Sequence, residues 1–188
     1  MTPVARVIES LTTLKTARKD QLRNIFASIA SRGKNIQIHD RSSSGDLIYS
    51  IADGFETGID YSEWRFQTIC ENIKASYYEV WTNHGKGNYF LVRSYFHLYL
   101  LSTEDMKMSE YILLHCDASE PDSGKHAMYK QSPHIHIEVA PNPLPKAHFA
   151  LYNGRIKEIL KGINSFNQAL KESIDMLNDQ VLKLLSEE

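Results

Sequence analysis

The chain has 188 residues, of which 42% are hydrophobic and 23% are charged, a composition typical of one globular domain with its own core. Its formal net charge of −2 excludes an overall polycation. No apolar run reaches the roughly 18 residues that a membrane-spanning helix needs, and the N-terminal segment lacks the apolar block of a secretory signal. The sequence therefore predicts no membrane contact and a cytoplasmic location. Cys70 and Cys116 lie singly in apolar segments and are expected to be reduced core residues.

Residues 1–32 are predicted to form an amphipathic helix. Thr2 and Pro3 are typical of a helix start, aliphatic residues recur at helical spacing from Val4 to Ile29, and Gly33 is a stop signal. Residues 1–35 also carry seven basic side chains against two acidic ones. We interpret this local charge as a solvated helix face in preference to a nucleic-acid footprint.

Residues 35–140 are predicted to form an antiparallel sheet of six or seven strands. Short segments of strand-like composition are separated by turns. The segment 41–46 is interpreted as a turn, because it lacks the lysine spacing and the following helix of a phosphate-binding loop. Two glycines and two asparagines at 83–88 indicate a hairpin between two longer strands.

The longest predicted strand, at 89–101, alternates between two faces. Because side chains of a strand point to opposite sides in turn, one face is expected in the core. The other is rich in hydrogen-bonding groups and would meet water or line a site. The core face is expected to hold Phe90, Val92, Phe96, Leu98 and Leu100, and the opposite face Tyr89, Leu91, Arg93, Tyr95, His97 and Tyr99.

Two later segments, at 111–117 and 133–139, repeat this division into an aliphatic and a polar face. Sequential strands are often neighbours in a sheet, so the three polar faces are expected to form one surface. This convergence is the main prediction from the sequence. The surface would carry Arg93, Tyr95, His97, His115, His134, His136 and Glu138.

The histidines of this surface fit a metal site. His134 and His136 are two residues apart on one predicted strand, so both rings would lie on one face with their Cα atoms about 6.5 to 7 Å apart. That spacing lets two imidazoles share a divalent metal. The predicted metal ligands are His134, His136 and Glu138, with His115 or His148 as a further ligand.

A second chemistry needs no metal. Two histidines can act as general base and general acid, because imidazole titrates near neutral pH, while a cation stabilises a pentavalent phosphate. Such a site would suit RNA, in which the 2′-hydroxyl is the nucleophile. The catalytic residues would be His134, His136, His115, Lys146 and His148, and the substrate-binding residues Arg93, Tyr95, His97 and Lys130.

Residues 154–187 are predicted to form a long helix. Its apolar residues repeat every seven positions, which is typical of a coiled-coil seam, with Asn167 at one core position. The seam would either join a homodimer or a partner protein, or pack on the first helix of the same chain. Its two rows are Ile156, Ile163, Leu170, Leu177 and Leu184, and Leu160, Asn167, Ile174 and Val181.

The sequence thus predicts one α+β domain over residues 1–188, with an antiparallel sheet between an N-terminal helix and a long C-terminal helix. Two functions fit it. The first is a small histidine-based hydrolase that cleaves phosphodiesters of RNA or a nucleotide, with or without a divalent metal. The second is a non-catalytic adaptor that binds a partner through its tyrosine, arginine and histidine face and oligomerises through the C-terminal helix.

Overall fold

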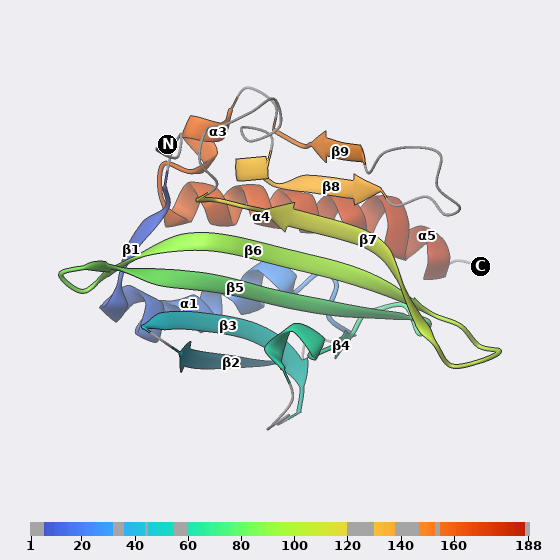
Figure 1. Cartoon of the computed structure of the whole chain (residues 1–188). Coiled ribbons are helices and arrows are strands. Elements are labelled where there is room, and N and C mark those ends of the chain that lie inside the picture. Colours follow the sequence, from blue (N-terminus) through green and yellow to red (C-terminus); the bar gives the residue numbers. More distant parts are fainter. Residues whose placement is uncertain are drawn as a thin grey trace.

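In a computed structural model the described residues are 6–31, 36–43, 45–54, 60–119, 130–137, 147–152 and 155–186. One antiparallel sheet crosses the molecule, and helices α1 (Leu11–Phe26) and α4 (Ile163–Leu177) both lie behind it in Figure 1. The predicted α+β fold is therefore confirmed. No helix within the described ranges is long and apolar enough to cross a membrane.

The described residues form nine strands. Short strands β1 (Ile8–Ser10) and β4 (Phe66–Gln67) pair with β6 and β5, off the main path of the sheet. The main path runs in the order β2 (Ile36–Ser43), β3 (Asp46–Asp53), β5 (Ile73–Gly85), β6 (Asn88–Leu101), β7 (Met108–Cys116), β8 (His134–Ile137) and β9 (Ala147–Ala150).

The hairpin between β5 and β6 lies where the sequence predicts it. Gly85, Lys86 and Gly87 all have positive φ, a conformation that glycine adopts without steric cost. The Asn83 side chain accepts a hydrogen bond of 2.6 Å from the Gly85 N–H and closes the turn. This tight turn sets the register of the two longest strands.

A β-bulge interrupts the alternation of β6. Val80 of β5 pairs with Arg93, but the next residue, Trp81, pairs with Leu91. Val92 is therefore an extra residue on β6, and the alternation reverses on its N-terminal side. An uninterrupted period of two cannot describe both halves of this strand.

The bulge makes part of the predicted face assignment wrong. Tyr89 and Leu91 are buried in the core, whereas Phe90 and Val92 are only partly buried. Beyond the bulge Phe96 and Leu98 are in the core as predicted, but Leu100 is 42% exposed near the end of the strand, and Tyr99 is buried on the opposite face.

The N-terminal helix is shorter than predicted at both ends. Residues 8–10 form β1, and helix α1 starts only at Leu11, where the Ser10 side chain accepts a hydrogen bond of 3.1 Å from the Thr13 N–H. The helix ends at Phe26. Thr2, Pro3 and Val4 of the predicted start lie outside the described residues, and Val7 and Ile8 join the sheet, where the Leu91 N–H donates to the Val7 carbonyl.

A buried ion pair joins α1 to the sheet. Arg18 donates from Nε and Nη2 to the two carboxylate oxygens of Glu79 at 2.7 and 2.6 Å, and both residues have no exposed surface. Tyr77 and Trp81 donate to the same carboxylate at 2.7 and 2.8 Å. The sequence interpretation of the N-terminal cations as a solvated face is therefore wrong for Arg18.

The C-terminal helix is divided into shorter segments. Helix α3 (Ile156–Ile159) precedes α4, and a π-helical turn (Asn178–Leu182) and α5 (Lys183–Ser186) follow it. Gly162, whose backbone is extended, caps α4 and interrupts the single helix that was predicted. The interruption lets α3 and α4 run in different directions (Figure 1).

The predicted seam packs inside the chain. Leu170 and Leu177 are buried in the core, and Asn167 accepts a hydrogen bond of 2.5 Å from Arg18 Nη1. Ser28 donates to Asp175 at 2.8 Å, a second link between the α1 end of the chain and α4. The alternative in which the stripe packs on the first helix is confirmed, and a homodimer through the buried part of this seam has no support.

Both cysteines are buried and free, as expected of core residues. Burial raises the pKa of the Cys116 thiol well above its usual value, and this thiol donates to the Gln131 carbonyl at 2.9 Å. A thiol held in its neutral form is a poor nucleophile and a poor metal ligand.

Candidate functional site

Four histidines and a tyrosine lie together on the face of the sheet opposite α1 and α4. Strands β6, β7 and β8 are neighbours, as predicted, and directly opposed residues of antiparallel strands share a face. We call Tyr95, His97, His115, His134 and His136 the histidine patch. Two adjacent cross-strand rows contain it: Tyr95, His115 and His134 in one, and His97, Leu113, His136 and His148 in the other.

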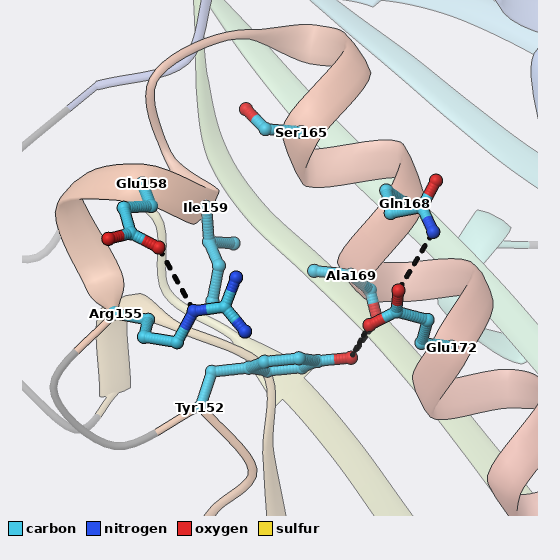
Figure 2. Close-up of a pocket in the computed structure, with 8 residues that line it drawn as sticks. All are labelled: Tyr152, Arg155, Glu158, Ile159, Ser165, Gln168, Ala169 and Glu172. Atoms are coloured by element: carbon cyan, nitrogen blue, oxygen red, sulfur yellow. Dashed lines mark hydrogen bonds and ion pairs between the residues drawn. The ribbon is translucent and has the colours of Figure 1, made fainter.

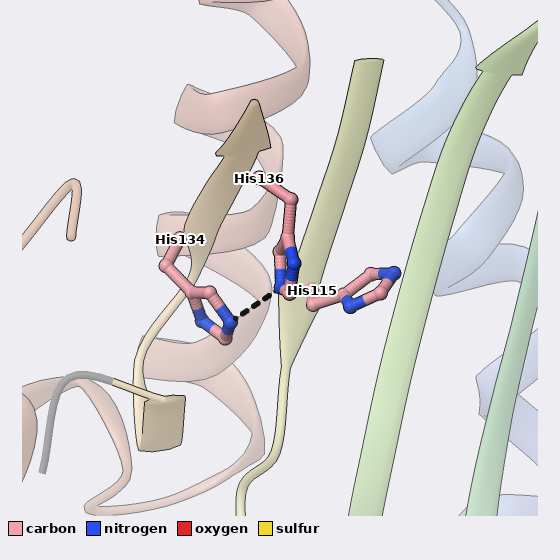
Figure 3. Close-up of side chains that lie close together, drawn as sticks. All are labelled: His115, His134 and His136. Atoms are coloured by element: carbon pink, nitrogen blue, oxygen red, sulfur yellow. Dashed lines mark hydrogen bonds between the residues drawn. The ribbon is translucent and has the colours of Figure 1, made fainter. Parts of the chain in front are cut away.

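Figure 3 shows three rings of the patch close together: His134 and His136 extend from β8 toward β7, and the ring of His115 lies on the other side of β7, toward β6. The Nε2 atoms of His134 and His136 are 3.0 Å apart, and the ring centroids of His115 and His136 are 4.3 Å apart. One ring nitrogen from each of the three histidines lies within 4.8 Å of the other two. His134 is fully buried, whereas His115 and His136 are partly exposed.

The hydrogen bonds of His134 indicate its tautomer. Its Nδ1 is 2.9 Å from the Ser132 carbonyl, which can only accept, so Nδ1 carries the proton. In the neutral ring with its proton on Nδ1, Nε2 has a lone pair. His136 Nε2–H therefore donates to His134 Nε2, and this contact pairs a protonated nitrogen with a bare one.

His97 extends the chain of imidazoles toward β6. Its Nε2 is 2.7 Å from His115 Nε2, and its Nδ1 is 2.9 Å from the Tyr99 hydroxyl. Burial and the nearby Arg65 guanidinium lower the pKa of His97 to about 4, so this imidazole is neutral at neutral pH. A neutral His97 has one N–H group and one bare ring nitrogen, so it donates in one of these two hydrogen bonds and accepts in the other.

Tyr95 packs against the imidazoles and borders an arginine. Its ring stacks on His115 with 3.9 Å between centroids, and its hydroxyl donates to the Asp117 carboxylate. Burial and Asp117 raise the pKa of Tyr95, so the hydroxyl stays protonated. The guanidinium of Arg93 lies 5.9 Å from the centre of the same ring, and Arg93 is exposed.

The other predicted site residues are described only in part. Glu138 and Lys146 lie outside the described residues. His148 belongs to β9, where its backbone is opposite His136, and its side chain is not described. Lys130 is partly buried, and its carbonyl accepts a hydrogen bond of 2.8 Å from the Asp117 N–H.

Two contributors to this face were missed by the sequence reading. Tyr78 of β5 pairs with Tyr95 in the backbone register, and the two rings meet edge to face at 5.4 Å. The Arg65 guanidinium lies 4.1 Å from the centre of the Tyr99 ring. The sequence identified β5 as a strand, but its tyrosine pair at 77–78 left open which ring faces the core.

A separate pocket of about 230 Å³ lies between α4 and the segment before it (Figure 2). Its polar groups bind one another: Arg155 Nε donates to Glu158 at 3.0 Å, and the Tyr152 hydroxyl donates to the Ala169 carbonyl at 2.8 Å and to Glu172 at 3.2 Å. None of its lining residues belongs to the histidine patch. Because these polar groups are hydrogen-bonded to one another, we interpret the pocket as a surface hydrogen-bond network.

Comparison with known proteins adds no function to this geometry. No family model matches the chain, and neither a curated protein nor a solved structure shows significant similarity to it.

Proposed function

We propose that the histidine patch is the centre of a hydrolase that cleaves phosphodiester bonds in RNA or a nucleotide. The observation that carries the proposal is the pair of imidazole contacts, 2.7 Å between His97 and His115 and 3.0 Å between His134 and His136. In each contact one imidazole nitrogen donates and the other accepts. In the proposed hydrolase one imidazole would serve as the base, and another, in its protonated form, as the acid.

Hydrolysis of a phosphodiester needs both. The base takes a proton from a water molecule or a 2′-hydroxyl, whose oxygen forms the new bond to phosphorus. The bond from phosphorus to the leaving oxygen breaks, and the acid gives that oxygen a proton. Arg93, exposed beside Tyr95, supplies positive charge for the phosphate, which a guanidinium binds through two parallel hydrogen bonds.

The contribution of the remaining predicted residues stays a prediction. Lys146 and His148 would add a cation and an imidazole from the segment that follows β8, and Lys130 a cation from the segment that precedes it. Because the same rings also suit a metal-assisted reaction, cleavage should be measured with and without a chelator.

Replacement of one imidazole tests the activity. His136 is only partly buried, so we expect His136→Ala to fold and to lose about 10²-fold or more of the cleavage rate on a mixed single-stranded RNA, the usual contribution of acid–base catalysis. The matched control is His84→Ala, which removes an exposed histidine of the β5–β6 hairpin. Equal rates in the parent chain and His136→Ala, or no cleavage by the folded parent, would exclude the proposed activity.

The second candidate is a non-catalytic module that binds a partner protein through the same face. Exposed Arg93 beside the tyrosines favours it, because arginine and tyrosine are enriched at interfaces. The buried seam of α4 argues against the C-terminal helix as the main contact. A partner whose binding is lost in Arg93→Ala, with no cleavage of RNA by the parent chain, would favour this candidate.

A further inference from the structure

We propose that His115, His134 and His136 bind one Zn²⁺ ion. The sequence alone points to His134, His136 and Glu138, with His115 or His148 as a further ligand. The folded chain brings His115 of the neighbouring strand into the group. The binding site stands on geometry alone. Its role as the cofactor site of a hydrolase rests on the proposed function.

The distance between two of the ligand nitrogens is close to that of a three-imidazole zinc site. Zinc binds imidazole nitrogen at about 2.0 to 2.1 Å in tetrahedral geometry, which puts two ligand nitrogens about 3.3 Å apart. The 3.0 Å between His134 and His136 differs from this by a few tenths of an ångström. With all three nitrogens inside 4.8 Å, the widest gap must close by about 1.5 Å, a movement within reach of ring rotations.

Two of the three rings are held by groups outside the cluster. Ligand histidines usually donate their second ring N–H to a carbonyl, carboxylate or water, which fixes the ring and its tautomer. His134 makes this contact from Nδ1 to the Ser132 carbonyl at 2.9 Å and directs Nε2 toward the cluster. His115 directs Nε2 toward His97 at 2.7 Å, and in the proposed site its Nδ1 binds the metal.

His97 is therefore a positioning residue and not a ligand. It contacts the far nitrogen of His115, and the Tyr99 hydroxyl at 2.9 Å fixes its own orientation in turn. His97 and Tyr99 lie on β6, next to His115 on β7, so the site with its supporting residues extends across three strands. Loss of such a supporting group typically costs 10- to 100-fold in metal affinity.

The ligand type selects the metal. Three neutral imidazoles suit Zn²⁺, whereas Mg²⁺ and Ca²⁺ require oxygen ligands. A site with three protein ligands keeps a fourth position for water, and zinc lowers the pKa of that water to about 7. In the proposed hydrolase this water would give its proton to solvent, and the hydroxide oxygen would form the new bond to phosphorus. The bond to the leaving oxygen would break, and that oxygen would take a proton from solvent.

Equilibrium dialysis of the full chain against Zn²⁺, after treatment with a chelator, tests the site. We expect about one zinc per chain by elemental analysis for the parent and for the control His84→Ala. His136→Ala and His115→Ala should lose more affinity than His97→Ala, whose dissociation constant should rise about 10- to 100-fold. Far-UV circular dichroism confirms that each variant is folded. Co²⁺ offers a second readout, because its visible absorption reports a tetrahedral nitrogen environment and should disappear in His136→Ala.

The outcomes separate the site from the activity. Stoichiometric zinc lost in the two ligand variants supports the site even if the protein cleaves no RNA, and that combination overturns only the proposed hydrolase. A folded parent that retains no zinc overturns the site. Zinc binding that is equal in the parent, His115→Ala and His136→Ala also overturns it. Cleavage that persists in chelator by a zinc-free chain overturns the role of zinc as the hydrolase's cofactor and leaves the acid–base hydrolase in place.

Discussion

At the scale of single residues, the ion pair between Arg18 and Glu79 shows most clearly how the structure corrects an interpretation based on sequence. Arg18 belongs to a locally basic segment, and charge along a chain does not show which cation is buried. In the folded protein its guanidinium binds Glu79 through two hydrogen bonds, and Tyr77 and Trp81 complete the carboxylate's contacts. Removal of either partner of such a buried ion pair destabilises the protein, because the other charge stays buried without compensation.

We expect Glu79→Gln to lower the free energy of unfolding by about 3 to 5 kcal/mol, because a buried guanidinium would lose its counter-charge. The measurement is urea unfolding followed by circular dichroism. Arg23→Met is the control, since Arg23 and Asp20 form an exposed pair at 2.6 Å on the same helix and should contribute at most about 1 kcal/mol. A similar decrease in the free energy of unfolding in both variants would show that burial does not make the Arg18–Glu79 pair more important for stability than an exposed pair.

At the scale of elements, the seven-residue repeat of the C-terminal helix fits two arrangements that the sequence cannot separate. Either a second chain or the first helix of the same chain covers a heptad stripe. Burial decides between them here, because Leu170 is 2% exposed, while Leu184, at the end of the same row, is 57% exposed. The stripe is thus part of the chain's own core over most of its length.

Leu170→Ala is therefore expected to lower the free energy of unfolding by about 2 to 5 kcal/mol, independently of protein concentration, because it leaves a cavity in the core. Leu184→Ala, an identical change at the exposed end of the row, should change it by at most about 0.5 kcal/mol. Urea unfolding at two protein concentrations checks both. A midpoint that depends on concentration in the parent and is lowered by Leu184→Ala would instead indicate a dimer through this row.

At the scale of the whole molecule, the sequence predicts the α+β class, the β5–β6 hairpin and the adjacency of β6, β7 and β8. These follow from local alternation and turn chemistry. Strands β1 and β9 were not predicted, because short strands form through pairing with neighbours that only the fold supplies. The bulge at Val92 was also missed, since one extra residue reverses an alternation without changing its composition.

The candidate site was predictable for the same reason as the sheet. His115, His134 and His136 come together because two alternating strands, β7 and β8, are neighbours in register. The supporting contacts of His97 and the Ser132 carbonyl were not predictable, because they depend on ring orientation. Sequence therefore indicated the histidines, and the structure indicates how their nitrogens are directed.

Nitrogen-15 NMR of the histidine side chains in the full chain, recorded before and after addition of Zn²⁺, tests most directly whether these imidazoles act as one site. Before zinc, His134 should be the neutral tautomer with its proton on Nδ1. On titration, the ring nitrogens of His115, His134 and His136 should shift together at one equivalent, with those of exposed His84 unchanged. Rings of the patch that neither share this transition nor respond to zinc would contradict a common centre.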